Sequence, residues 1–332
     1  MKISSGLLDT GLLYPLMQQT LQMYLRGEAL LQSPVADWGR KTLAAGKWWY
    51  GVEKLPVEER EAGIRQRLDC IVGMFEAFKA HGYIGSEVTV KFDAEGNLWV
   101  HDGFHRLCIM RFLGIKANVN CRVQQDFPLE DTLRELNSGE NLYQPTGDAR
   151  TAGWNLWRTD CLERLNLVRH YLVDGSVLDG GCESGYFTRA LSGLGFQVLG
   201  VDCNVRRVAV ARYLAATQNV KCNFKAASWQ NALQEDSYSN VLLLSVLHHD
   251  AIKRGIKFAL GELAVLSGKC KRAIIEFPLE SEGVYWLCGG GQRWSFNHQE
   301  LAQTLEAITG MRAIAVLEGA SVNRPLIVLE AV

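Results

Sequence analysis

One segment of the chain could bind a ligand through its backbone. In residues 176–187 an apolar run ends in Asp179, and Gly180, Gly181 and Gly185 follow before a helical pattern begins. Glycine has no Cβ, so a ligand can approach the backbone closely at these positions. Ligands of open α/β sheets bind at the carboxyl ends of the strands, where this loop must lie. The segment therefore predicts a ligand site.

A second acid, Asp202, ends the next apolar run at residues 198–201. A carboxylate at the end of a second strand can accept hydrogen bonds from both hydroxyls of a ribose. The glycines of the preceding loop do not follow the G-x-G-x-x-G spacing of dinucleotide sites. The two acids thus favour a ribose-containing cofactor other than a dinucleotide.

These residues need a sheet to position them, and strands and helices alternate strictly from about residue 154. We expect strands at 177–179, 197–202, 221–226, 241–246, 272–277, 312–318 and 324–330. We expect helices at 154–172, after residue 185, and at 205–216, 252–267 and 298–309. This alternation predicts a doubly wound α/β sheet with helices on both faces.

Four segments in this order, 176–187, 198–202, 240–249 and 274–278, resemble the motifs of class I S-adenosylmethionine (SAM)-dependent methyltransferases. The resemblance covers the chain from about residue 154 onward. It implies a Rossmann-like methyltransferase sheet and SAM as cofactor. The cofactor-binding residues it implies are Asp179, Gly181, Cys182, Glu183, Gly185, Asp202, Cys203, Ser228, Trp229 and Ser245.

Two residues depart from the family pattern. Glu183 stands where the common motif has a glycine, and Asn240 stands where an acid often opens the fourth strand. The acid that often meets the adenine amine is also missing, so we expect Ser228 to make that contact and Trp229 to stack on the adenine. These departures keep open a catalytically inactive regulatory protein that binds SAM or a nucleotide.

Three side chains are candidates for catalysis. His248 and His249 directly follow the predicted fourth strand, and an imidazole can remove a proton near neutral pH. Glu276, at the end of the predicted fifth strand, is the second candidate group. The alternative is that one histidine is packed and shapes the pocket. The aromatic and glycine-rich residues 285–294 could form a substrate lid or an ordinary connection.

The N-terminal half shows a different pattern. A helix after Pro56, a hairpin at 88–92 and 98–100, a short helix at 104–113 and a strand at 117–123 indicate an α+β domain. Residues 98–107 and 113–115 resemble the ParB/sulfiredoxin-like superfamily. That resemblance implies nucleotide binding or phosphotransfer ancestry.

Residues 102–106 form a predicted turn whose side chains suit the binding of an anion. Asp102 could cap the following helix, and His105 and Arg106 would lie in its first turn, where an arginine could hold a phosphate. We therefore predict phosphate or nucleotide binding at Asp102, His105 and Arg106, with ATP or CTP as candidates. An inherited scaffold or a site for the acceptor are the alternatives.

The composition limits which other classes of protein the chain can belong to. The formal net charge of −1 gives no case for a large nucleic-acid interface, and no apolar run approaches the roughly 18–20 residues of a membrane span. The nine cysteines include no CxxC pair, so a structural metal site is not expected. We expect a cytoplasmic protein, without predicting its oligomeric state.

We divide the chain into a ParB/sulfiredoxin-like domain at 1–125, a linker at 126–152 and a methyltransferase domain at 153–332. The expected activity is methyl transfer from SAM to a small polar acceptor: a sugar, a phosphorylated metabolite or a natural-product intermediate. An RNA or protein methyltransferase is the enzymatic alternative, and RNA binding would be sensitive to salt.

Overall fold

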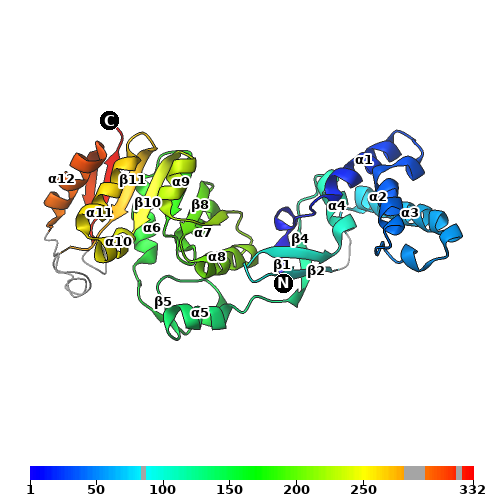
Figure 1. Ribbon diagram of the computed structural model, residues 1–332, viewed down its shortest axis with the longest axis horizontal. Coiled ribbons are helices and arrows are strands. Elements are labelled where there is room, and N and C mark those ends of the chain that lie inside the picture. The colour runs from blue at the N-terminus through cyan, green and yellow to red at the C-terminus, as the bar shows by residue number, and fades with distance from the viewer. Residues whose placement is uncertain (84–86, 280–295, 319–323) are drawn as a thin grey trace. The chain divides into compact units, whose positions relative to one another are not determined.

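The computed structural model describes residues 1–83, 87–279, 296–318 and 324–332 (Figure 1). The chain forms two compact units. Unit 1 contains residues 1–93 and 98–126, and unit 2 contains residues 94–97 and 127–332.

Unit 1 combines a four-stranded sheet with helices. Its sheet has the order β1 (Lys2–Ser4), β4 (Asn118–Gln125), β2 (Val88–Phe92) and β3 (Leu98–Asp102). Its helices are α1 (Leu13–Leu25), α2 (Pro34–Ala44), α3 (Arg60–His81) and α4 (Phe104–Phe112). The predicted hairpin is confirmed, because β2 and β3 pair antiparallel.

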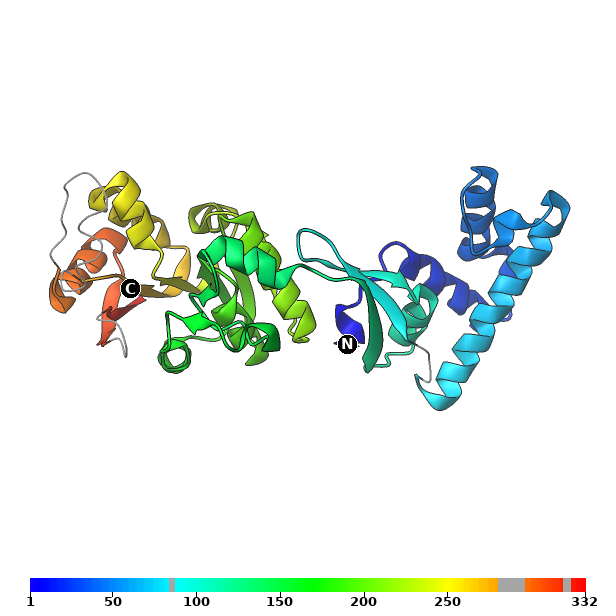
Figure 2. The same cartoon turned by 90° about the horizontal axis from the view of Figure 1, so that it is seen from below.

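The long helix α3 supplies much of the core of unit 1 (Figure 2). Its apolar residues recur at steps of three and four, and five of them are buried: Ile64, Leu68, Ile71, Phe75 and Phe78. A stripe with this spacing packs one face of a helix against its neighbours. The helix ends before Gly82, whose φ of +73° suits glycine.

Unit 2 is built around a seven-stranded sheet. Its strands are β7 (Ser176–Gly180), β8 (Gln197–Asp202), β9 (Asn223–Ala226), β10 (Tyr238–Leu244), β11 (Cys270–Glu276), β12 (Arg312–Leu317) and β13 (Leu326–Glu330). Their order is β12-β13-β11-β10-β7-β8-β9. The five strands from β11 to β9 are parallel, and β13 is antiparallel to both of its neighbours. The predicted α/β sheet is confirmed.

Helices cover both faces of this sheet. They are α6 (Cys161–Tyr171), α7 (Tyr186–Gly193), α8 (Val205–Thr217), α9 (Trp229–Glu235), α10 (Leu247–Arg254), α11 (Ile256–Gly261) and α12 (His298–Thr309). Adjacent strand residues point to opposite faces, so Val177 packs with α6 and α7, whereas Leu178 packs with α9 to α12.

Three boundaries differ from the sequence-based expectation. The helix expected at 154–172 begins only at Cys161, because residues 155–156 form β6 (Asn155–Leu156), which pairs with β5 (Asn141–Leu142). The helix expected at 252–267 is broken by Gly255, whose φ is +92°. Residues 127–152 belong to unit 2 and include α5 (Leu129–Asn137), whose Glu135 forms an ion pair of 2.5 Å with Arg206 of α8.

Candidate cofactor and acceptor site

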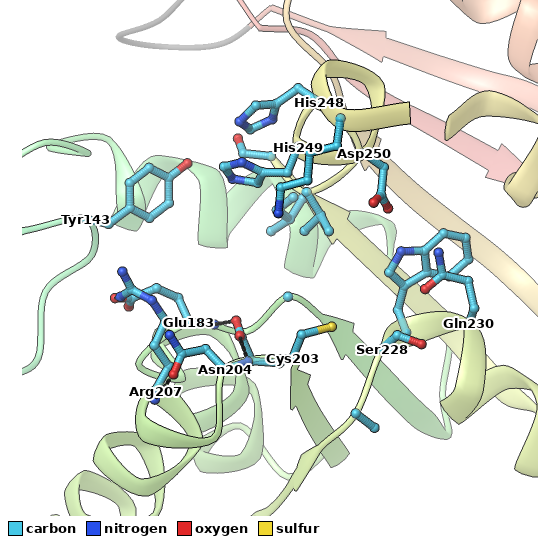
Figure 3. A pocket seen from close by; sticks show the side chains of 18 of the residues that line it. Tyr143, Glu183, Cys203, Asn204, Arg207, Ser228, Gln230, His248, His249 and Asp250 are labelled. Atoms are coloured by element: carbon cyan, nitrogen blue, oxygen red, sulfur yellow. Dashed lines mark hydrogen bonds and ion pairs between the residues drawn. The ribbon is translucent and has the colours of Figure 1, made fainter. Parts of the chain in front are cut away.

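The carboxyl ends of the parallel strands meet at one edge of the sheet. Asp179 is in register with Gly200 and Asp202 with Ala226, so the loops after β7, β8 and β9 lie side by side. A pocket of about 700 Å³ opens at this edge (Figure 3). Its size is within the range of small-molecule and cofactor sites.

The loop after β7 forms one wall of the pocket. The amides of Gly181 and Cys182 both donate to the carbonyl of Val201, at 2.8 and 2.9 Å. Gly181 has a φ of +71°, and a Cβ there would lie 2.5 Å from Cγ2 of Val246. Only glycine fits this place, and its backbone faces the pocket.

Glu183 extends the same wall. Its φ of +54° is unusual for a residue other than glycine, and its carboxylate forms an ion pair with Arg207. Its amide donates to Oδ2 of Asp202 at 3.1 Å. The glycine-rich loop and the end of β8 are thereby joined.

Asp202 fits the predicted ribose contact. Oδ1 accepts from the amide of Asn204 at 2.8 Å, and Oδ2 accepts from Glu183. Each carboxylate oxygen can accept a further hydrogen bond, and Asp202 lines the pocket. The side chain is therefore fixed in orientation and able to accept from two hydroxyls.

Three of the predicted cofactor residues lie beneath the pocket lining. Asp179 is buried and accepts from Oγ1 of Thr188 at 2.6 Å, and burial raises its pKa to about 6. Cys182 is also buried, which raises the pKa of its thiol well above the usual value. A Cβ on Gly185 would lie 2.6 Å from Cε1 of Phe224. These residues support the loop from below.

Cys203, Ser228 and Trp229 also line the pocket. Oγ of Ser228 accepts from the amide of Asn231 at 3.1 Å and so caps α9. The indole Nε1 of Trp229 is buried and has no hydrogen-bond partner among the residues that the structure describes. It could donate to a base bound here.

His248 and His249 both line the pocket from the first turn of α10 (Figure 3). Their ring centroids are 4.1 Å apart. His248 is buried and His249 is exposed. Desolvation of the rings lowers the pKa of both imidazoles, that of His248 far below its ordinary value, and the positive charges of Lys253 and Arg324 lower the pKa of His249 further. Both rings are thus neutral near pH 7.

Glu276 is completely buried within a network of polar side chains. It forms ion pairs with Arg158 at 3.0 Å and Arg164 at 2.7 Å, and it accepts a hydrogen bond from Ser245. Ser245 also accepts from Nη1 of Arg324 at 2.9 Å. Ser245 reaches the pocket, whereas the carboxylate of Glu276 lies behind it.

Sequence reasoning missed several lining residues: Tyr143, Trp157, Asn204, Arg207, Ala227, Gln230, Leu244, Val246, Asp250, Lys253, Arg254 and Arg324. Asn204 and Arg207 could have been found, because they closely follow Asp202: Asn204 is the N-cap of α8 and Arg207 lies in its first turn. Tyr143 and Trp157 precede the first strand of the sheet, and no motif marked them.

In unit 1 the prediction that Asp102 caps the helix after it is wrong. Gly103 is the N-cap of α4, with a φ of +105°, and no side chain caps the helix. Asp102 instead forms an ion pair of 3.2 Å with Arg106, whose Nη1 also donates to the carbonyl of Glu87 at 3.1 Å. His105 does lie in the first turn, 4.7 Å from the ring of Tyr50, and burial lowers its pKa to about 4.

Two further observations concern the whole chain. The aromatic and glycine-rich segment predicted as a lid, 285–294, lies outside the described residues. Among the helices that the structure describes, none is long and apolar enough to cross a membrane.

Comparison with known proteins identifies the domain. Residues 177–264 match the family model of a methyltransferase domain. The O-antigen chain terminator bifunctional methyltransferase/kinase WbdD of Escherichia coli is 28% identical over 139 residues, which cover 38% of this chain. The ubiquinone biosynthesis O-methyltransferase of Nitrosococcus oceani is 27% identical over 110 residues, or 32% of this chain. Within unit 2, residues 177–264 therefore match a methyltransferase domain, and two of the relatives are named as methyltransferases.

The chain spans 20% of the length of the bifunctional relative and 47% of the O-methyltransferase. A crystal structure of WbdD has 24% identity and a TM-score of 0.49, and the match covers 61% of this chain and 46% of that one. Magnesium protoporphyrin IX methyltransferase of Synechocystis PCC 6803, solved with SAM bound, has 16% identity and a TM-score of 0.40, with 52% and 77% covered.

Proposed function

We propose that this protein transfers a methyl group from SAM to a small polar acceptor. One observation carries the proposal: Asp202 stands at the end of β8, oriented by two backbone amides, beside a glycine that presents bare backbone to the pocket. When bound, SAM supplies a methyl group activated by a sulfonium. The residues of the chain hold it and position the acceptor.

The binding roles follow from these positions. Asp202 accepts from the ribose hydroxyls, and the backbone at Gly181 packs against the cofactor. Ser228 and Trp229 contact the adenine, the indole through its buried N–H. Because the pocket walls come from rigid strand ends, they can fix the relative orientation of the two reactants, which contributes on the order of 7–11 kcal/mol where geometry is ideal.

His249 is the residue we assign as general base. It is exposed at the pocket, and its lowered pKa keeps it neutral and able to take a proton from an acceptor hydroxyl. His248 is buried beside it and shapes the pocket. Glu276 is a positioning residue, since two guanidinium groups and a serine occupy its carboxylate.

The acceptor class rests on the pocket and the relatives. A cavity of about 700 Å³ has room for a cofactor and a small acceptor, which favours a sugar, a phosphorylated metabolite or a natural-product intermediate. One relative is named as an O-methyltransferase and another as a chain terminator of O-antigen. The net charge of −1 weighs against an RNA acceptor.

Calorimetric titration with SAM and then S-adenosylhomocysteine tests the cofactor site. We expect micromolar affinity for the wild-type protein and none measurable for Asp202→Ala. Asp250→Ala is the matched control, because Asp250 also lines the pocket but is paired with Arg254 at 2.8 Å. Unchanged affinity in Asp202→Ala would refute the ribose contact, and absent binding to folded wild-type protein would favour a regulatory protein without activity.

For unit 1 we propose binding of a nucleotide or its phosphate at the first turn of α4. His105 and Arg106 lie there, and helix amides and the helix dipole favour an anion. Titration with ATP and CTP checks this, with Arg106→Ala expected to abolish binding and to leave SAM affinity unchanged. An affinity that survives Arg106→Ala would leave the turn as an inherited scaffold.

A further inference from the structure

Two aromatic side chains reach the pocket from a segment outside the sheet. The short strands β5 and β6 pair in parallel, and backbone hydrogen bonds between the two segments continue just beyond these strands. The amide of Trp157 donates to Leu142 at 2.8 Å, and that of Arg158 donates to Tyr143 at 3.2 Å. Tyr143 and Trp157 are thereby fixed in the same stretch of the pocket wall.

The side-chain hydroxyl of Tyr143 is one of the buried polar groups of the pocket wall. Its Oη is buried, yet no hydrogen bond to it exists among the described residues. A buried hydroxyl without a hydrogen bond destabilises the folded protein. This cost is offset where a bound ligand supplies the hydrogen-bond partner. Figure 3 shows the hydroxyl end of the Tyr143 side chain directed toward the ring of His249. The Tyr143 hydroxyl thus indicates that a bound ligand places a polar atom here, near the proposed base His249.

Trp157 is an indole at the pocket that is largely open to solvent. Its exposed fraction is 76%, which is high for the largest apolar side chain. An exposed indole at the pocket offers a flat apolar surface on which a ring can stack. This favours an acceptor with a ring whose face is apolar and whose edge carries hydroxyls.

The pocket lining includes basic side chains, among them Lys253 and Arg324. Arg324 is buried and lines the pocket, where it donates to Ser245. Of the three acids in the described lining, Glu183 pairs with Arg207 and Asp250 with Arg254, and Asp202 is the residue assigned to the cofactor ribose. Lys253 adds an exposed ammonium to the lining. An anionic substituent would therefore be favoured here.

We infer that Tyr143, Trp157 and Arg324 form the acceptor subsite, and that it takes a hydroxylated ring with a negatively charged substituent. Trp157 stacks on the ring, Tyr143 hydrogen-bonds to it, and Arg324 attracts the charge. This inference rests on the proposed function, because it describes the acceptor half of the same pocket.

The test measures binding of defined probes to protein saturated with S-adenosylhomocysteine. Glucose 6-phosphate and glucuronate carry the expected ring and charge, and glucose is the neutral comparison. Calorimetry or ligand-observed NMR should detect at least one anion, with glucose bound at least about tenfold more weakly. Binding of only one anion identifies the charged group as phosphate or carboxylate.

Variants assign the contacts. Trp157→Ala should weaken anion binding by about tenfold, and Tyr143→Phe by roughly two- to tenfold. Both should keep the affinity for S-adenosylhomocysteine. Trp48→Ala is the matched control, since Trp48 is an exposed indole (65%) in unit 1.

Two results would overturn the inference. One is that neither anion binds to protein that does bind S-adenosylhomocysteine. The other is that Trp157→Ala and Tyr143→Phe bind the probes as the wild type does. Failure of the proposed function is distinct, because S-adenosylhomocysteine itself would then not bind.

Discussion

Glu183 of the glycine-rich loop forms an ion pair with Arg207 of α8, and the same guanidinium donates to Oδ1 of Asn137 at 3.1 Å. Asn137 is the last residue of α5. The loop is thus tied to two helices at the point where the common motif has a glycine. A residue with a Cβ at a φ of +54° is strained, and the ion pair offsets this strain.

Substitutions of Glu183 should separate strain from pairing. Glu183→Gly removes both the strain and the ion pair, so we expect a small change in the free energy of unfolding. Glu183→Val keeps the strain with a β-branched side chain and loses the pair, so it should be less stable than Glu183→Gly by about 1–2 kcal/mol. Urea unfolding measures the difference. Equal stability of the two variants would show that the backbone here carries no strain.

Asp179 should make stability depend on pH. Burial raises its pKa from 3.8 to about 6, so between these values the folded state holds the proton more tightly than the unfolded state does. Stability is then greatest below pH 4 for this group and is lost as the pH rises through 6.

The variant Asp179→Asn should lack this loss, because it cannot ionise. Its stability relative to wild type should increase from pH 4 to pH 7 by up to about 3 kcal/mol. Urea unfolding of both proteins across this range checks the sign. Parallel stability curves would mean that Asp179 has the same pKa in the folded and unfolded states.

Much of unit 2 could be predicted because its signals are local. The helix at 298–309 has the predicted bounds, since Asn297 caps it in a capping box with Glu300 and Gly310 ends it. The strand ends that carry Asp179 and Asp202 were also predicted. Their side-by-side placement follows from parallel pairing alone.

The remaining parts of the site depend on long-range contacts. Tyr143 and Trp157 reach the pocket through the pairing of β5 with β6, two strands of two residues each, which no periodicity could show. The burial of Glu276 depends on Arg158 and Arg164, more than a hundred residues away in the sequence. From its position alone, Glu276 was indistinguishable from a group exposed at the acceptor site.

Glu276→Gln should strongly destabilise the protein. The change leaves Arg164 buried without its carboxylate partner, whereas Arg158 keeps its ion pair with Asp160, and breaking a buried pair in this way costs about 3–5 kcal/mol. Glu330→Gln is the matched control, since Glu330 also bridges two arginines, Arg272 and Arg312, but is partly exposed. The loss of stability in Glu330→Gln should be much smaller.

Urea unfolding of the two glutamine variants at pH 7 provides the comparison. Equal losses of stability in the two variants would show that burial does not determine how much such an ion-pair network stabilises the protein. If Glu276→Gln remained as stable as wild type, Glu276 would be available for a direct role with the acceptor.

The pH dependence of methyl transfer should identify the base. Desolvation lowers the pKa of His249 below 6.5, so kcat/KM should rise as the pH rises through that lowered value and reach a plateau near neutral pH. His249→Gln should reduce kcat/KM by about 10²–10⁴-fold and remove the acidic limb of the profile.

The melting temperature of His249→Gln should stay close to that of wild type, because His249 is exposed. His248→Gln places an amide in a buried site and should lower the melting temperature instead. A profile in which the acidic limb persists in His249→Gln would assign the proton transfer to another group.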